Sequence, residues 1–247
     1  TMGSVSIEPW NKVSFADAAG KFLPVMIVKN GLAYIYLDRA TKGTAQIADS
    51  IQSAQRKHYV YDLVFYGKKN GKLDLSAANN MLKTTDIRSV DLTGVTDLTE
   101  IEPYSFRSQD NYTDFSKLEK VYLPGSVTKI GKSAFEGSLI TKITTPGVET
   151  LEEAAFKNCK KLESITLNNL TGTLPSYSFE NCIAMNSAYM PKITEIAEYA
   201  FKSAGLNEGN QGHVDFSSVT RIHSYAFESS SVTGGIYPKG EVPMGLN

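Results

Sequence analysis

Five residues occupy the same position in successive copies of a strand-like segment, and their side chains could bind a ligand. They are Tyr122, Thr144, Thr166, Tyr189 and Asp215. Phenol, hydroxyl and carboxylate groups form directional hydrogen bonds, and tyrosine adds an apolar ring. Side chains alternate across a strand, so we expect these five to point away from the core and form one face. The same face would include Asp91, Ile236, Lys120, Lys142, Ser164, Ser187 and His213. The competing interpretation is a solvated sheet face that binds nothing.

Catalytic chemistry has few candidates in this chain. The histidines are His58, His213 and His223, and none stands in a recognisable nucleophile or metal motif. Glu152 and Glu153 occupy variable repeat positions and are expected on the solvated surface. We therefore predict no catalytic residue, no cofactor and no metal, and a protein that is not an enzyme.

The two cysteines, Cys159 and Cys182, are 23 residues apart, which is one repeat. Other copies have mostly small residues at this position, so we expect two buried apolar side chains. Stacked turns lie about 4.8 Å apart, within reach of a disulfide, and a bridge stays open as an alternative.

A second aromatic set precedes a repeated phenylalanine by two residues: Tyr104, Tyr177, Tyr199 and Tyr225. Aromatic stripes in repeat proteins usually pack ring on ring. We predict a packing ladder, with an exposed aromatic binding strip as the alternative.

These residues are positioned by a unit that occurs six times. An aliphatic residue is followed four positions later by Ser or Ala and five positions later by Phe. The copies are Glu100 to Phe106, Lys129 to Phe135, Thr150 to Phe156, Thr173 to Phe179, Glu195 to Phe201 and Arg221 to Phe227. Strand-like runs centre on Val90, Val121, Ile143, Ile165, Ala188, Val214 and, weakly, Gly235, at spacings of 31, 22, 22, 23, 26 and 21 residues. A period in the twenties predicts a solenoid of stacked turns.

Two insertions lengthen the repeat, at 107–116 and 205–212, and we expect both to be surface loops.

The first 58 residues lack the repeat. Asn30-Gly31 between two β-rich runs predicts a hairpin, and Thr44 to Arg56 reads as a helix with Thr44 as its N-cap. We expect a small α+β cap that covers the end of the solenoid. Residues Tyr61 to Gly67 either form a hairpin with Leu73 to Ser76 or begin the solenoid, and we prefer the second.

Composition sets further bounds. With 25 Lys and Arg, 26 Asp and Glu and a net charge of −1, the chain has no basic footprint for nucleic acid. No run reaches the roughly 18 apolar residues of a membrane span. The beginning, Thr-Met-Gly-Ser, has no signal-peptide pattern, and we expect any signal peptide or lipid anchor to have been removed.

The repeat resembles the BspA-type leucine-rich repeats of bacterial surface proteins, over about residues 61–240. The pattern is apolar-x-x-apolar-x-Leu-Pro followed by Ile-x-x-Tyr/Ser-Ala-Phe-x-x-Cys, and the best copies are Leu118 to Phe135 and Leu162 to Cys182. The resemblance implies an α/β repeat solenoid: a right-handed curved horseshoe with a parallel concave sheet and short helical turns on the other side. It also implies secreted or surface-anchored proteins of host-associated bacteria that act in adhesion.

We thus expect an N-terminal α+β cap at 1–58, a leucine-rich-repeat solenoid of about seven to eight turns at 59–240, and a tail at 241–247. The expected function is extracellular or cell-surface binding of a host protein or glycan through the concave face. The alternative is an architectural spacer without a ligand of its own. The sequence does not name the ligand or the oligomeric state.

Overall fold

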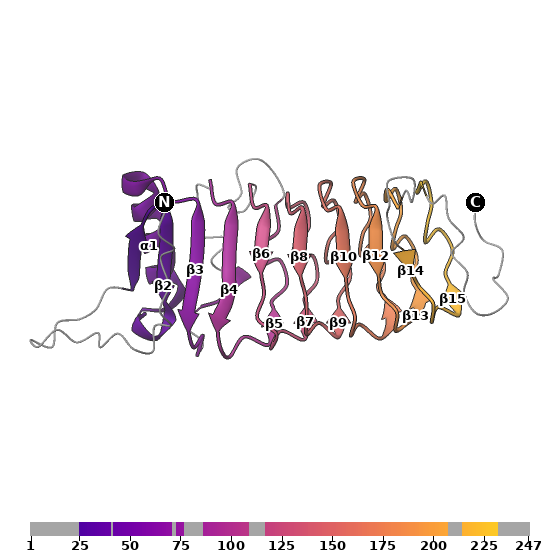
Figure 1. Cartoon of the computed structure of the whole chain (residues 1–247), viewed down its shortest axis with the longest axis horizontal. Coiled ribbons are helices and arrows are strands. Elements are labelled where there is room, and N and C mark those ends of the chain that lie inside the picture. Colours follow the sequence, from indigo (N-terminus) through magenta and orange to yellow (C-terminus); the bar gives the residue numbers. More distant parts are fainter. Residues whose placement is uncertain are drawn as a thin grey trace, which may run out of the picture.

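The computed structural model describes residues 25–40, 42–70, 73–76, 86–108, 117–206 and 214–231. Its main feature is a nine-stranded sheet, the long sheet, whose strands lie side by side along the longest axis of the molecule (Figure 1). In spatial order the strands are β1 (Met26–Lys29), β2 (Leu32–Tyr36), β3 (Asp62–Gly67), β4 (Ser89–Val95), β6 (Lys120–Tyr122), β8 (Lys142–Thr144), β10 (Ser164–Thr166), β12 (Ser187–Tyr189) and β14 (Val214–Asp215). All neighbours from β2 onward are parallel, as expected for a solenoid.

The predicted strand centres pair in register along this sheet. Val90 is opposite Val121, Val121 opposite Ile143, Ile165 opposite Ala188, and Ala188 opposite Val214. The first five of these residues are buried, so each turn places one apolar side chain directly above the last. The repeat spacing read from the sequence is therefore confirmed as the rung spacing of the fold.

Two short three-stranded sheets form where the chain returns, so the expected short helical turns are wrong: the described residues from 86 onward form strands and turns and no helix. The first contains β5 (Glu100–Ile101), β7 (Lys129–Ile130) and β9 (Thr150–Leu151), and the second contains β11 (Gly172–Leu174), β13 (Ile193–Ile196) and β15 (Arg221–Ile222). Each of these strands includes the first two residues of a copy of the repeated heptapeptide. The parallel pairing of these strands fixes the register of the turns that follow.

The six repeated phenylalanines form a continuous stack inside the solenoid, called here the phenylalanine stack. Consecutive ring centroids are 5.2, 5.2, 5.5, 5.3 and 5.2 Å apart from Phe106 to Phe227, and each pair is stacked. The first five rings are fully buried and Phe227 is 7% exposed. Burial of one such side chain contributes roughly 3 kcal/mol, so this stack is a major source of stability.

Cys159 and Cys182 are buried free thiols inside the turns. The Cys159 thiol donates a hydrogen bond to the carbonyl oxygen of Phe135 (3.0 Å), and Cys182 does the same to Phe156 (3.1 Å). The expectation of small buried side chains is confirmed, and the alternative of a bridge between them is wrong in this structure. Each thiol instead links one turn to the preceding one.

The hairpin and the helix expected before the repeats are present at one end of the long sheet (Figure 1). Strands β1 and β2 pair antiparallel around Asn30 and Gly31, whose φ values of 53° and 80° suit a two-residue turn. Helix α1 (Gly43–His58) buries Ile47, Ala48, Ile51 and Ala54 on one stripe. Its predicted role as a cap stays a prediction.

The expected N-cap of α1 is wrong. Lys42 is the N-cap and makes no side-chain cap hydrogen bond, so the helix begins one residue before Thr44. The Thr44 hydroxyl instead accepts a hydrogen bond from the backbone N–H of Asp74 (2.8 Å). The hydroxyl that was expected to cap the helix therefore binds a residue 30 positions away in the sequence.

Strand β3 decides between the two interpretations of Tyr61 to Gly67. It pairs in parallel with β2 and β4, and Leu63 is opposite Val90. This is the arrangement of a solenoid turn, and the hairpin with Leu73 to Ser76 is wrong. Residues 109–116, 207–213 and 232–247 lie outside the described residues, including His213, Gly235, Ile236 and most of both insertions. Curvature and handedness stay predictions.

Candidate functional site

The five predicted site residues lie in one row across five adjacent strands, called here the outward row. Tyr122 is opposite Thr144, Thr166 is opposite Tyr189, and Tyr189 is opposite Asp215. Ser164 is opposite Lys142, so Thr144 and Thr166 take corresponding positions two residues later. The structure thus brings together all five side-chain positions that the strand alternation predicted.

The outward row lies on the face of the long sheet opposite to the core. Val121, Ile143 and Ile165 alternate with it and are buried. Tyr122 is 44% exposed, Thr144 and Thr166 are exposed, and Tyr189 and Asp215 are half-buried. Asp215 accepts a hydrogen bond from the backbone N–H of Ser217 (2.9 Å), which orients its carboxylate. The row therefore offers phenol, hydroxyl and carboxylate groups to a partner.

The same face of the long sheet continues beyond the outward row, further toward the N-terminal end than sequence reasoning indicated. Asp91 is opposite Tyr122, Val64 is opposite Asp91, and Tyr34 is opposite Val64. The signal was present in the alternation of 32–36, but the first 58 residues lack the repeat and were assigned to a separate unit. The face is thus longer than the repeats alone.

A tyrosine cluster lies beside this extension. The Tyr66 ring stacks on Tyr34 at 6.4 Å and on Tyr36 at 5.8 Å, and the Arg39 guanidinium lies 4.1 Å from the Tyr36 ring centroid. Burial raises the pKa of Tyr36 to about 12, so its phenol stays protonated at neutral pH. A side chain at Gly94 would collide with the Tyr66 ring, which explains glycine in β4.

The second tyrosine set packs ring on ring, as predicted, for three of its four members. Tyr177 stacks on Tyr199 at 5.3 Å, and Tyr199 stacks on Tyr225 at 5.4 Å. Tyr104 is separated from them by turns that carry Ser133 and Ala154 at the same position, and its ring faces Arg107. Because the ring faces cover one another, this set cannot offer a broad stacking strip to a ligand.

Charges on the turns alternate in sign and pair between neighbours. The residue after each repeated phenylalanine is Arg107, Glu136, Lys157, Glu180, Lys202 or Glu228. Ion pairs join the first two (3.0 Å), the middle two (2.6 Å) and the last two (2.7 Å). Sequence reasoning did not identify this alternation, although it can be read directly from the six copies. These charges stabilise the stack of turns and leave little net charge at that surface.

Three of the residues considered for catalysis, Glu152, Glu153 and His223, form ion pairs at the surface. Glu152 pairs with Lys129 (2.7 Å) and Glu153 with Lys132 (3.3 Å), in agreement with the expected surface positions. His223 lies 3.4 Å from Glu195, and its hydrogen bond lowers the pKa of that carboxyl. Within the described ranges, no group of three or more potential metal ligands gathers.

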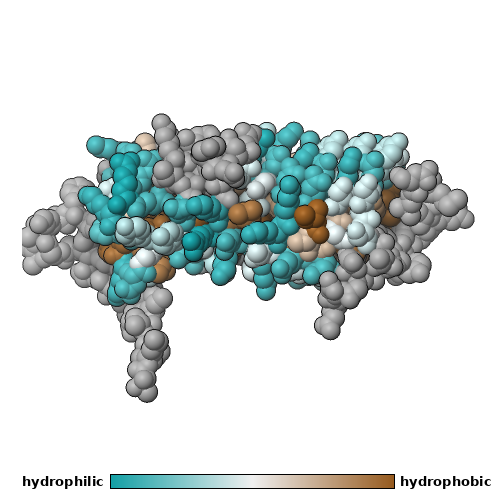
Figure 2. Space-filling view, turned by 90° about the horizontal axis from the view of Figure 1, so that it is seen from above, coloured by the Kyte–Doolittle hydropathy of each residue, from teal (hydrophilic) through white to brown (hydrophobic). Residues whose placement is uncertain are grey.

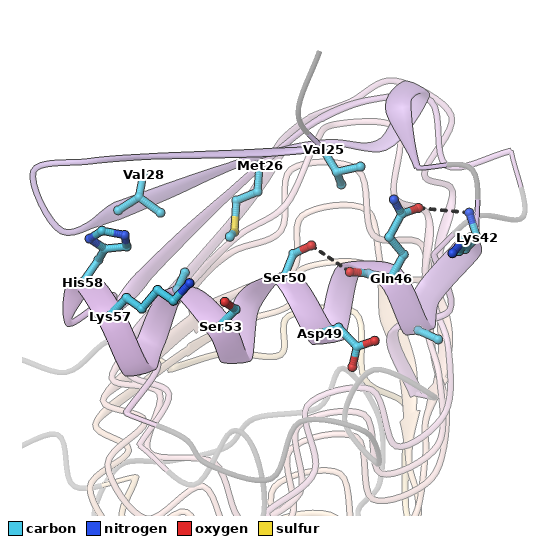
Figure 3. A pocket seen from close by; sticks show the side chains of 12 residues that line it. Val25, Met26, Val28, Lys42, Gln46, Asp49, Ser50, Ser53, Lys57 and His58 are labelled. Carbon is cyan, nitrogen blue, oxygen red and sulfur yellow. Dashed lines mark hydrogen bonds between the residues drawn. The ribbon is translucent and has the colours of Figure 1, made fainter. Parts of the chain in front are cut away.

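A cavity of about 730 Å³ lies between β1 and α1 (Figure 3). Val25, Met26 and Val28 line one side, and α1 contributes polar residues that include Asp49 and His58. The apolar side faces a helix surface rich in hydroxyl, amide and charged groups. This concavity can hold an apolar side chain, and it is distant from the outward row, which begins on β6, four strands beyond β1.

The surface seen from above relative to Figure 1 is mainly hydrophilic, with apolar residues in small separate areas (Figure 2). Within the described residues, no helix is both long and apolar enough to cross a membrane.

The family of the chain is shown by a comparison with models of known protein families. The family model of the BspA type leucine rich repeat region matches residues 99–233 in six copies, which is more than half of the chain. A crystal structure of a leucine-rich repeat protein from Eubacterium ventriosum is similar at 15% identity, covering 88% of this chain and 95% of that one, with a TM-score of 0.26. No curated protein matches. The six matched copies and the parallel stack of turns show that this chain belongs to the BspA-type leucine-rich repeat family.

Proposed function

We propose that this chain is a non-enzymatic, adhesin-like binding module that recognises a protein or glycan through the outward row. The observation that supports this function best is the alignment of Tyr122, Thr144, Thr166, Tyr189 and Asp215 on five adjacent strands. Repeat proteins bind extended partners over such faces, because every turn adds one ligand-facing position. Leucine-rich repeats are generally non-enzymatic modules of protein interaction.

The proposed location is extracellular or at the cell surface. Proteins with BspA-type repeats are typically bacterial surface proteins, which supports this location. The partner would be a molecule of the host that the surface meets, either a protein or a glycan.

Binding to an array of extracellular-matrix proteins and glycans tests the proposal. The variant Tyr122→Ala, Tyr189→Ala, Asp215→Ala should lose any specific hit, because it removes both phenols and the carboxylate of the row. A matched control, Tyr59→Ala, Tyr104→Ala, Asp86→Ala, changes the same residue types at exposed positions away from the long sheet. Circular dichroism establishes that both variants fold. Equal binding by the row variant and the wild-type chain would exclude this face as the site.

The second candidate is an architectural spacer that displays another part of a surface protein. The uninterrupted phenylalanine stack favours it, because a continuous aromatic core over six turns makes a stiff rod. This candidate predicts that the array yields no partner for the wild-type chain.

A further inference from the structure

Two lysines lie side by side on the same face as the outward row, and we call them the basic pair. Lys120 on β6 is directly opposite Lys142 on β8, and both side chains are exposed. Neighbouring strands are about 4.8 Å apart, so the two Cβ atoms are close. Like charges directly opposite each other destabilise a sheet. The fold therefore bears a cost at this point.

Elsewhere the same turns avoid this cost. The charges after the phenylalanines alternate in sign, and Lys129 lies between Glu100 (3.0 Å) and Glu152 (2.7 Å). Neither member of the basic pair forms an ion pair with any carboxylate of the described part of the chain. Departures from otherwise consistent patterning are expected at functional sites.

Acidic residues lie on both sides of the basic pair. Asp91 on β4 is opposite Tyr122 and one strand from Lys120, and Asp215 on β14 marks the other end. Between the pair and Asp215 the face carries the hydroxyl residues of β10 and β12. From β4 to β14 there are five strand intervals, or about 24 Å. The face thus carries a basic pair between two carboxylates, with Asp91 one strand from β6 and Asp215 three strands from β8.

We propose that the basic pair binds clustered carboxylates of a protein partner, and that cationic groups of the same partner lie against Asp91 and Asp215. This inference rests on the proposed function and specifies its partner. Complementary charge patterns steer association and reject wrong partners. A uniformly anionic glycan would satisfy the lysines but meet repulsion at both acidic flanks. A protein surface can present both signs, and the pattern therefore favours a protein.

Two probes of defined chemistry test this inference. One is a synthetic peptide with a short run of glutamates flanked by lysines on both sides, and the other is a heparin oligosaccharide. We expect the immobilised wild-type chain to bind the peptide more tightly than heparin at low ionic strength. The variant Lys120→Glu, Lys142→Glu should weaken peptide binding by about tenfold or more, because it reverses the central charge.

The control variant is Lys160→Glu, Lys161→Glu. Both residues are exposed, lie in a turn outside the long sheet, and give the same change in net charge. Peptide binding by this variant should equal that of the wild-type chain. Equal losses in both variants, or no peptide binding at all, would overturn the inference. If heparin binds more tightly than the peptide and this binding depends on the basic pair, the inferred protein partner is wrong and an acidic glycan is the partner.

The array experiment separates this inference from the proposed function. A hit that requires Tyr122 and Tyr189 but tolerates Lys120→Glu, Lys142→Glu would keep the outward row as the site and remove only the acidic partner. A hit that tolerates both the outward-row variant and Lys120→Glu, Lys142→Glu would remove the proposed function as well.

Discussion

Single residues of the phenylalanine stack differ in how many neighbours support them. Phe156 lies between Phe135 at 5.2 Å and Phe179 at 5.5 Å and is fully buried. Phe227 is the last ring of the described stack and retains some exposure. A ring that is enclosed on both faces leaves a larger cavity when it is removed.

Phe156→Ala is therefore expected to lower the free energy of unfolding by about 3–5 kcal/mol. Phe227→Ala should cost less, because its site can collapse or admit water more readily. Urea denaturation of both variants measures the difference. Equal losses would contradict the picture of a stack whose interior is packed more tightly than its end.

The Cys159 thiol should behave as a buried group in titration. Burial raises its pKa to about 12, from an ordinary value of 9.0. Between these values the unfolded chain releases the thiol proton and the folded chain retains it, so this contribution to stability is lost as pH rises through the window. Cys159→Ala should remove that part of the pH dependence. Native protein at pH 8 should not react with a thiol reagent, whereas unfolded protein should react at both cysteines. Rapid labelling of the native chain would contradict the burial.

Turns of the solenoid contain glycines whose roles differ despite equal backbone angles. Gly137 and Gly172 both have φ of 75°. A Cβ at Gly137 would collide with the carbonyl oxygen of Ser108 on the preceding turn, whereas a Cβ at Gly172 has no neighbour within 4 Å. Only the first glycine is required by the close stacking of turns.

The two alanine substitutions separate conformational strain from the collision. Gly172→Ala should cost roughly 1 kcal/mol from the left-handed conformation alone. Gly137→Ala should cost clearly more, since the backbone of one turn must move away from the next. Thermal unfolding of the two variants tests this, and equal shifts in Tm would show that the turns move apart freely.

Ion pairs between turns act at the scale of the short return strands. The hydrogen bond from Lys129 is the largest cause that lowers the pKa of Glu152. A carboxyl with a lowered pKa stabilises the fold above its ordinary pKa of 4.5, and this contribution is lost as pH falls through the lowered value.

Lys129→Met should raise the Glu152 pKa toward 4.5 and change the stability at neutral pH only slightly, because the pair is partly exposed and screened by solvent. A carbon-detected NMR titration of the Glu152 carboxyl measures the shift. An unchanged titration in the variant would show that the pair is not formed in solution.

The elements that repeat could be predicted from the sequence, and those defined by distant contacts could not. The pairing of Val90 with Val121 and of Val121 with Ile143 could be predicted from spacing alone. The alternation along each strand and the length of the repeat are together compatible with one pairing of neighbouring strands. The role of the Thr44 side chain could not be predicted, because its hydroxyl accepts a hydrogen bond from the backbone N–H of Asp74, 30 residues away. The face could be predicted where alternation is regular, and its extension to Tyr34 needed the parallel pairing of β2 with β3.

The described turns form a row in which each strand of the long sheet pairs with the strands next to it. Stability in such arrays is the sum of the turns and their interfaces, so terminal turns have one interface fewer. Hydrogen exchange should therefore be slowest in β8, β10 and β12 and faster toward β14 and β15. Mass spectrometry of exchanging peptides measures this gradient. Uniform protection along the chain would indicate a single cooperative unit instead.

The strands of the long sheet are equally spaced, so the distances between side chains on its face are fixed by the number of turns between them. Inserting or deleting one complete turn between β8 and β14 would leave the register of every other turn intact. It would shift Asp215 relative to the basic pair by one step of about 4.8 Å. Distances between charges on the face can thus change only in whole steps, so relatives that differ in turn number would differ in the spacing of the partner charges they match.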